Sequence, residues 1–103
     1  MKILLACSSG MSTSLLVSKM KDAAREKGME AEIWAVAQDK AESDMEKADV
    51  LLIGPQMRFL FKKISKVADE KGVPVEVIDP ISYGRIDGEA VLDKALELIQ
   101  KKV

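Results

Sequence analysis

Hydrophobic residues gather in four short runs along the chain, and within each run they are mostly continuous. The runs occupy residues 2–7, 32–37, 50–53 and 75–78. Continuous apolar runs of this length are typical of strands covered on both faces, as in a parallel sheet. The second run adds Ile33, Trp34 and Val36, whose branched and aromatic side chains favour strands. The pattern therefore predicts four strands, and residues 50–53 form the clearest buried one.

The stretches between these runs have a helical period, because their apolar residues return every three or four positions. The predicted helices begin near Leu15, Asp39, Met57 and Gly88. Gly28 and Gly72 supply the left-handed residues that end the first and third helices. Asp39 has the form of an N-cap, with Glu42 as its capping partner. Residues 79–84, which begin with Asp-Pro, are expected to form a loop.

Alternating strands and helices predict a single α/β domain over residues 1–103. We expect an open four-stranded parallel sheet in the order 2-1-3-4, with right-handed crossovers and helices on both faces. In that order the chain reverses direction between the first and third strands. The loop after the first strand then opens at the switch point, where such sheets bind ligands. Cys7 lies at that end of the first strand.

The composition narrows the range of functions. The net charge is −1, from 16 basic and 17 acidic side chains, so no overall attraction to nucleic acid is expected. No run is long enough to insert into a membrane, and no signal peptide is recognisable. The single cysteine cannot form an internal disulfide, and we expect a cytoplasmic protein whose thiol stays reduced. With no histidine in the chain, neither a metal site nor another cofactor is expected.

The loop that begins at Cys7 carries the chemistry that the sequence suggests. Its members are small or hydroxyl-bearing residues with one methionine: Ser8, Ser9, Gly10, Met11, Ser12, Thr13 and Ser14. A cysteine at a strand end is, by itself, more often a small buried hydrophobe than a nucleophile. However, a backbone curl at Gly10 leading into a helix would point several N–H groups at one spot and favour a thiolate and a phosphoryl group there. The hydroxyls are expected mainly to form turns and caps, with one or two touching phosphate.

This loop resembles the phosphate loop of low-molecular-weight tyrosine phosphatases, whose pattern is cysteine, five residues, arginine, then serine or threonine. Cys7 and Ser14 match that pattern, but Thr13 stands where the arginine would be. The guanidinium would have held the phosphoryl oxygens and stabilised the transition state. Without it, a cysteinyl phosphate could form, yet water would hydrolyse it poorly. A phosphoryl carrier fits this loop better than a phosphatase.

Over essentially its whole length the chain resembles the B component (IIB) of lactose/cellobiose-type phosphoenolpyruvate-dependent sugar phosphotransferase systems. The resemblance rests on Cys-Ser-Ser-Gly-Met-Ser-Thr-Ser-Leu-Leu-Val from Cys7, and on the segments 48–56, 74–79, 83–84 and 87–88. It implies that Cys7 takes a phosphoryl group from a phosphohistidine of the A component (IIA). Cys7 would then pass it to a sugar held by the membrane-embedded C component (IIC), such as cellobiose, chitobiose or lactose. The chain would act as a monomeric protein-phosphocysteine–sugar phosphotransferase.

Four further residues are candidates for auxiliary or docking roles, each with a structural alternative. Leu15, like Met11, could form an apolar docking rim or point into the core. Gln56 could contact the site or only shape the turn after the third strand. Asp79 stands where those phosphatases carry a general acid, although it also suits a strand-ending turn. Tyr83 could contact a partner or cap the core.

Two rival functions remain open on the sequence. One is a hydrolytic tyrosine phosphatase on the same scaffold, against which Thr13 argues. The other is a thiol redox or arsenate-reducing protein, which usually needs resolving cysteines that this chain lacks. The sequence does not identify the sugar.

Overall fold

A four-stranded parallel sheet forms the centre of the molecule. The structure, a computed structural model, describes residues 1–7 and 10–102, apart from the side chains of residues 10–12, 38, 101 and 102. The strands lie in the order β2-β1-β3-β4, as the sequence predicts. Their bounds are β1 (Lys2–Cys7), β2 (Glu32–Ala37), β3 (Val50–Ile53) and β4 (Val75–Val77).

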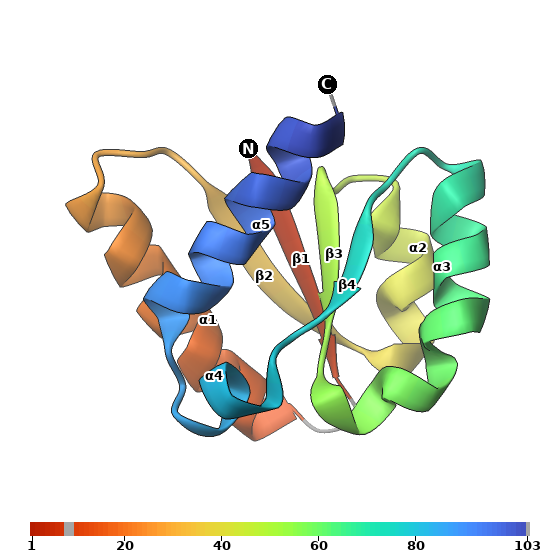
Figure 1. Ribbon diagram of the computed structural model, residues 1–103, viewed down its shortest axis with the longest axis horizontal. Coiled ribbons are helices and arrows are strands. Elements are labelled where there is room, and N and C mark those ends of the chain that lie inside the picture. The colour runs from red at the N-terminus through yellow and green to blue at the C-terminus, as the bar shows by residue number, and fades with distance from the viewer. Residues whose placement is uncertain (8–9, 103) are drawn as a thin grey trace.

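Helices cover both faces of the sheet, which confirms the predicted α/β architecture. One face carries α1 (Gly10–Glu26) and α5 (Gly88–Lys102), and the other carries α2 (Ala41–Met45) and α3 (Phe61–Glu70) (Figure 1). Shorter turns of helix complete the chain: η1 (Gln38–Lys40), η2 (Pro55–Leu60) and α4 (Pro80–Gly84). Within the described residues, no helix is both long and apolar enough to span a membrane.

The alternation of side chains along the central strands separates two hydrophobic cores. Ile3 and Leu5 of β1 face α1 and α5, whereas Leu4 and Ala6 face α2 and α3. These β1 side chains are at most 1% exposed, because β1 has a paired strand on each side and a helix layer on each face. This burial on both faces explains why the strand reads as a continuous apolar run.

The first helix starts earlier than predicted. We expected it near Leu15, but α1 begins at Gly10. The prediction followed the apolar stripe, which starts at Leu16, whereas the first turn of the helix holds Met11 among glycine and hydroxyl residues and shows no stripe. The helix N-terminus consequently lies within the loop that the sequence singled out.

The capping pair predicted for the second helix is wrong. Asp39 lies within η1, and the residue at the N-cap of α2 is Lys40, with no side-chain hydrogen bond to the helix. The chain tightens into a 3₁₀ turn before α2, so the expected spacing between Asp39 and Glu42 does not fall on the helix start. Such 3₁₀ turns are common at helix ends.

The segment expected to be a loop contains the short helix α4. Asp79 is its N-cap, since its Oδ1 accepts a hydrogen bond of 3.2 Å from the Ile81 N–H, and Pro80 occupies the first turn. An acceptor side chain followed by proline is a regular way to start a helix. Tyr83 thereby acquires a fixed position on α4.

The end of the sheet predicted to carry the site is clearly separated from the chain termini. Both termini lie at the top of Figure 1, whereas the carboxyl ends of the strands point to the bottom. The start of α1, η2 and α4 gather at that lower end. We call it the carboxyl edge, and the opposite end the amino edge.

Candidate functional site

Cys7 is the last residue of β1 and lies at the carboxyl edge. It pairs with Ala37 of β2, and α1 begins three residues later at Gly10. A helix N-terminus carries partial positive charge from N–H groups that have no partner within the helix, and it favours anions. This arrangement suits an anionic group bound at Cys7. Ser8 and Ser9, and with them the predicted curl of the loop, lie outside the described residues.

The Cys7 side chain is buried, with 2% of its surface exposed. It belongs to the core on the α2 and α3 face, together with Ala6 and Met57. Burial alone would suit the inert, hydrophobic cysteine that the sequence left open. The position of Cys7 beside a helix N-terminus is the feature that distinguishes it from an ordinary core cysteine.

The start of η2 lies directly against the end of β1. The Gly54 N–H donates a hydrogen bond of 2.9 Å to the Ala6 carbonyl, which continues the parallel ladder to the site. A Cβ added to Gly54 would lie 3.5 Å from the Cβ of Cys7 and 2.7 Å from Oε1 of Gln56. The absence of a side chain at Gly54 therefore lets the amide of Gln56 lie close to Cys7.

Three of the residues named by the sequence meet through their side chains. Gln56 Nε2 donates a hydrogen bond of 3.1 Å to Tyr83 Oη, and Tyr83 Oη lies 3.4 Å from Thr13 Oγ1. Thr13 is 1% exposed and is the one buried polar side chain among those described. The sequence suggested each residue separately but gave no sign of their contact, since Thr13 and Tyr83 are 70 positions apart.

The remaining loop residues are distributed along the first turns of α1. Gly10 begins the helix, and the side chains of Met11 and Ser12 lie outside the description. Ser14 and Leu15 are exposed. Leu15 is 48% exposed, so the alternative that it points into the core is wrong.

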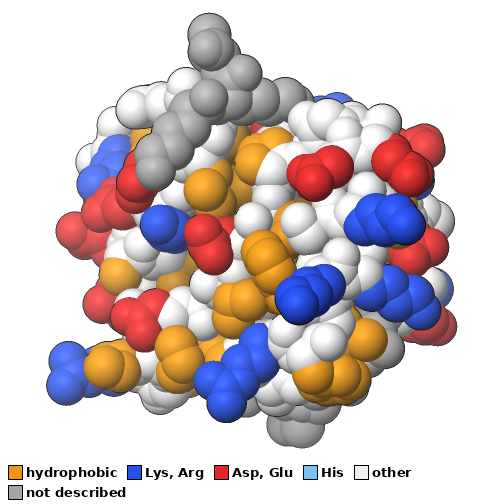
Figure 2. Space-filling model, turned by 45° about the vertical axis from the view of Figure 1, so that its right-hand side comes forward, with side chains coloured by type: hydrophobic (Ala, Val, Ile, Leu, Met, Phe, Trp, Pro, Cys, Tyr) orange, Lys and Arg blue, Asp and Glu red, His pale blue; other side chains and the backbone are white. Residues whose placement is uncertain are grey.

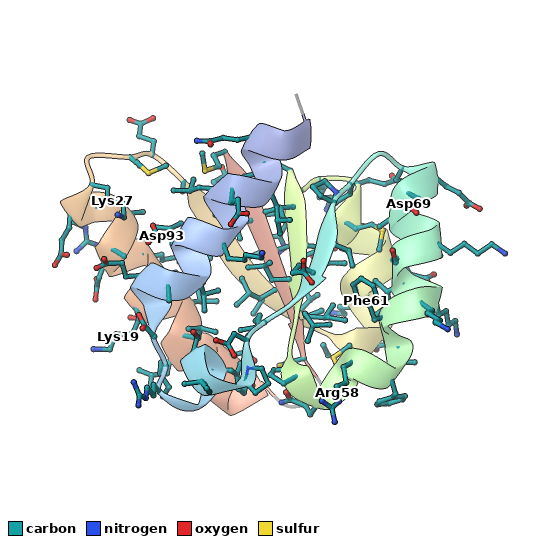
Figure 3. All side chains as sticks on the ribbon, viewed as in Figure 1. Lys19, Lys27, Arg58, Phe61, Asp69 and Asp93 are labelled. Atoms are coloured by element: carbon teal, nitrogen blue, oxygen red, sulfur yellow. The ribbon has the colours of Figure 1, made fainter. Side chains whose placement is uncertain are left out.

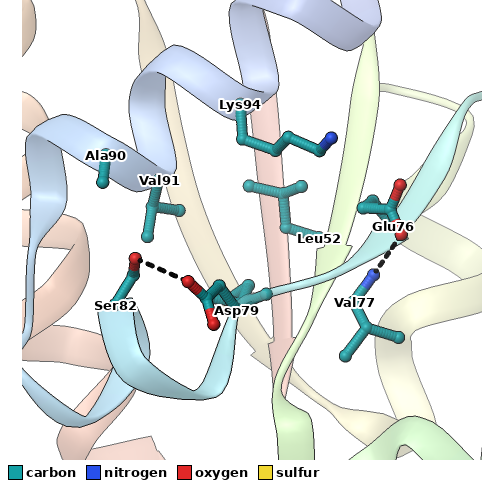
Figure 4. Close-up of a pocket in the computed structure, with 9 residues that line it drawn as sticks. Leu52, Glu76, Val77, Asp79, Ser82, Ala90, Val91 and Lys94 are labelled. Carbon is teal, nitrogen blue, oxygen red and sulfur yellow. Dashed lines mark hydrogen bonds between the residues drawn. The ribbon is translucent and has the colours of Figure 1, made fainter.

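Asp79 lies beside a groove of about 490 Å³ between β4, α4 and α5 (Figure 4). Leu52 and Val91 are among the residues that line it, and Cys7 is not. Besides capping α4, Asp79 accepts a hydrogen bond of 3.4 Å at Oδ2 from the Ser82 hydroxyl. Both carboxylate oxygens thus make the contacts expected of a strand-ending turn. Within the described residues, no group of His, Cys, Asp or Glu side chains could hold a metal ion.

Exposed hydrophobic side chains surround the site. Phe59 of η2 is 76% exposed and Ile81 of α4 is 65% exposed, so with Leu15 they place apolar surface on three elements. Figure 2 shows separate hydrophobic patches along the lower edge of the molecule, with basic side chains between them. Arg58 points outward at the same edge (Figure 3). The sequence analysis missed Phe59 and Ile81.

Comparison with known proteins gives one consistent family. The sequence model described as "PTS system, Lactose/Cellobiose specific IIB subunit" matches residues 2–94. The chain is 61% identical to the oligo-β-mannoside-specific EIIB component of Bacillus subtilis, over 95% of each chain. It is 44% identical to the galactose-specific EIIB component of Lactococcus lactis, over 94% of each chain.

A solved structure agrees with these relatives. The cellobiose-specific IIB component of Borrelia burgdorferi superimposes with a TM-score of 0.83 at 39% identity, over 99% of this chain and 94% of the other. The likeness covers the whole sheet and its helices. Together with the family match and the 61% identical relative, it shows that this chain belongs to the lactose/cellobiose-specific IIB subunits of the sugar phosphotransferase system.

Proposed function

We propose that Cys7 carries a phosphoryl group as a cysteinyl phosphate between two partner proteins during sugar uptake. The observation that carries the proposal is the position of Cys7, three residues before the N-terminus of α1, in a chain of the IIB family. The helix N–H groups supply fixed partial positive charge where the three phosphoryl oxygens would lie. The proposal places the protein in the cytoplasm.

The reaction would proceed in two transfers. In the first, the thiolate of Cys7 attacks the phosphorus of a phosphohistidine on the A component. A bond from sulfur to phosphorus forms, the bond from nitrogen to phosphorus breaks, and the imidazole keeps the electron pair and takes up a proton. In the second, a sugar hydroxyl held by the C component attacks the phosphorus and loses its proton, while the thiolate leaves. Each transfer depends on in-line positioning and on fixed dipoles.

The side chain at position 13 supports a carrier over a phosphatase. Thr13 occupies the place of the phosphatase arginine. Its side chain is neutral, and its hydroxyl contacts Tyr83. A threonine hydroxyl cannot supply the charge that an arginine brings to the hydrolytic transition state. A phosphoryl group on Cys7 would then persist until a sugar hydroxyl takes it.

The carboxyl edge also suits transient docking of the two partners. Leu15, Phe59 and Ile81 expose apolar surface around the site, and Arg58 adds positive charge beside it. Exposed apolar side chains ringed by polar ones mark protein interaction sites. Both partners must reach Cys7, so we infer that they use this edge in turn rather than together, with a monomer sufficient for both.

The sugar is proposed to be a β-linked oligosaccharide. The relative at 61% identity is named for oligo-β-mannosides, and the Borrelia structure is named for cellobiose. The sugar itself is bound by the C component, so the test is a panel of A and C components with mannobiose, cellobiose, chitobiose and lactose, and with maltose as a disaccharide that has no β-linkage. We expect phosphorylation of one β-linked member of this panel; exclusive phosphorylation of a sugar without a β-linkage contradicts the assignment.

The decisive test of the carrier function uses phosphate labelled through the upstream phosphotransferase proteins and the A component. We expect one label per chain, and we expect Cys7→Ser to abolish sugar phosphorylation. A Cys7→Ala protein that still takes up the label would overturn the proposal. Rapid turnover of an aryl phosphate by this protein without any partner would instead favour the phosphatase.

A further inference from the structure

The hydrogen-bonded side chains of Gln56, Tyr83 and Thr13 connect three elements at the carboxyl edge. Gln56 belongs to η2, Tyr83 to α4 and Thr13 to α1, and the links measure 3.1 Å and 3.4 Å. The Tyr83 ring packs against the core on the α1 and α5 face, while its hydroxyl reaches the other two residues. The Tyr83 ring is thus held by packing. Its hydroxyl joins α1, whose first turn belongs to the phosphate loop, to η2 and α4.

Gln56 Nε2 donates its hydrogen to Tyr83 Oη, whereas either hydroxyl can donate in the contact between Tyr83 Oη and Thr13 Oγ1. Tyr83 Oη is therefore the shared atom of the two contacts. Thr13 is the fourth residue of α1, so its position fixes the first turn, whose N–H groups would hold the phosphoryl group.

Gln56 also links these hydrogen-bonded side chains to the immediate surroundings of Cys7. Its Oε1 occupies the space that a Cβ on Gly54 would fill, and that Cβ would also touch the Cβ of Cys7. One end of the Gln56 amide therefore lies against the strand ends that carry Cys7, and the other end binds Tyr83. A side chain at position 54 would displace the Gln56 amide, although the hydrogen-bonding groups of Gln56, Tyr83 and Thr13 would all remain.

We propose that Gln56, Tyr83 and Thr13 form a positioning chain, which locks the first turn of α1 in the geometry needed for phosphoryl transfer at Cys7. The inference rests on the proposed carrier function and adds a role for three residues outside the reacting atoms. In a site without an arginine, the phosphoryl oxygens depend on backbone and hydroxyl donors, so small errors in the placement of α1 reduce the transfer rate.

The test uses three variants that disrupt the positioning chain of Gln56, Tyr83 and Thr13 at different side chains. Tyr83→Phe keeps the ring and removes the hydroxyl, Gln56→Leu removes the donor, and Gly54→Ala forces the Gln56 amide aside. For phosphoryl transfer from the A component, we expect kcat to fall about tenfold in each, the loss typical of one hydrogen bond, with KM unchanged. Because the residues act as a unit, the double variant Tyr83→Phe with Gln56→Leu should be no slower than the slower single variant.

Trp34→Phe is the matched control, because it removes a side-chain hydrogen bond of 3.1 Å to Asp44 away from this chain. Its kcat should equal that of the unaltered protein. A Tyr83→Phe protein with unchanged kcat, or one whose loss appears only in KM, would overturn the proposal, as would strictly multiplicative losses in the double variant.

A second readout separates this inference from the carrier function. In amide NMR spectra, Tyr83→Phe should shift the signals of residues 10–14, whereas Trp34→Phe should leave them in place. Unshifted signals would overturn the positioning chain even if Cys7 carries phosphate. Conversely, shifted signals in a protein whose Cys7 never takes up label would sink the carrier function and leave the chain as a structural link only.

Discussion

The two edges of the sheet use glycine for different purposes. At the amino edge, Gly28 and Gly72 adopt φ values of 69° and 70°, and nothing lies within 4 Å of where their Cβ atoms would be. At the carboxyl edge, Gly54 has an ordinary φ of −64°, and Gly54 and Gly88 are crowded by neighbouring elements. The amino edge needs glycine to reverse the chain, whereas at the carboxyl edge Gly54 lets Gln56 lie close to Cys7 and Gly88 lets α5 pack closely on α1.

The two edges also differ in the charge of the side chains that connect their elements. The amino edge is joined by charged groups, such as the 3.1 Å ion pair of Lys71 with Glu46 and the Lys2 N–H bound to Asp49 Oδ2. The carboxyl edge is joined by the neutral side chains of Gln56 and Tyr83. These neutral partners add no negative charge beside the N-terminus of α1, which suits an anion there.

The largest loss of stability is expected from a substitution at Gly88, the most crowded glycine of the carboxyl edge. A Cβ on Gly88 would lie 2.4 Å from the backbone carbon of Lys19 and 2.6 Å from the nitrogen of Met20. Because these are backbone atoms of α1, they cannot move aside cheaply. We expect Gly88→Ala to lower the free energy of unfolding by about 3 kcal/mol, measured by urea denaturation.

Gly84→Ala is the control for crowding, since its Cβ would meet nothing within 4 Å. Its effect should stay within about 0.5 kcal/mol. Equal losses for the Gly84 and Gly88 variants would show that close approach is not what the carboxyl edge requires.

An intermediate effect is expected from the exposed hydrophobic residues. Phe59→Ser and Ile81→Ser remove docking surface at the carboxyl edge without disturbing the core, since both side chains are mostly exposed. We expect the KM for the A component to rise about tenfold in each, with kcat and the unfolding midpoint unchanged. Steady-state phosphoryl transfer measures both constants.

Glu30→Ser, an exposed substitution at the amino edge, serves as the matched control and should leave KM unaltered. If Glu30→Ser raised KM as much as Phe59→Ser, docking would not be specific to the carboxyl edge.

The smallest effect is expected from the glycines of the amino edge. Gly72→Ala would force an alanine into the left-handed region without any clash, so the cost is conformational and amounts to about 1 kcal/mol. Phosphoryl transfer should be unchanged at temperatures where the variant is folded. A loss of transfer rate in the folded variant would contradict the separation of the two edges.

The strands were predictable because their signal is local. β1, β2 and β3 have the predicted bounds, since each carries its own run of apolar or β-branched residues, and β4 is one residue shorter than its run. The strand order followed from general rules on crossovers. The start of α1 was not predictable from periodicity, because its first turn carries no apolar stripe.

The candidate site was only partly predictable. Cys7 and its helix follow from neighbouring residues in the sequence, and so do the individual candidates Gln56 and Tyr83. Their contact with Thr13 does not, because it joins residues brought together by the tertiary fold and depends on α4, which was expected to be a loop. The signal for α4 was present in Asp79-Pro80, an N-cap followed by a first-turn proline.

The central claim is that phosphate resides on the sulfur of Cys7, and not on one of the neighbouring hydroxyls. The most direct measurement is ³¹P NMR of the protein after phosphorylation by the A component, with peptide mass spectrometry to locate the group. The account predicts one phosphorus signal in the thiophosphate range, on the peptide that contains Cys7, and its disappearance in Cys7→Ser. A signal in the phosphoserine or phosphothreonine range, retained in Cys7→Ser, would contradict it.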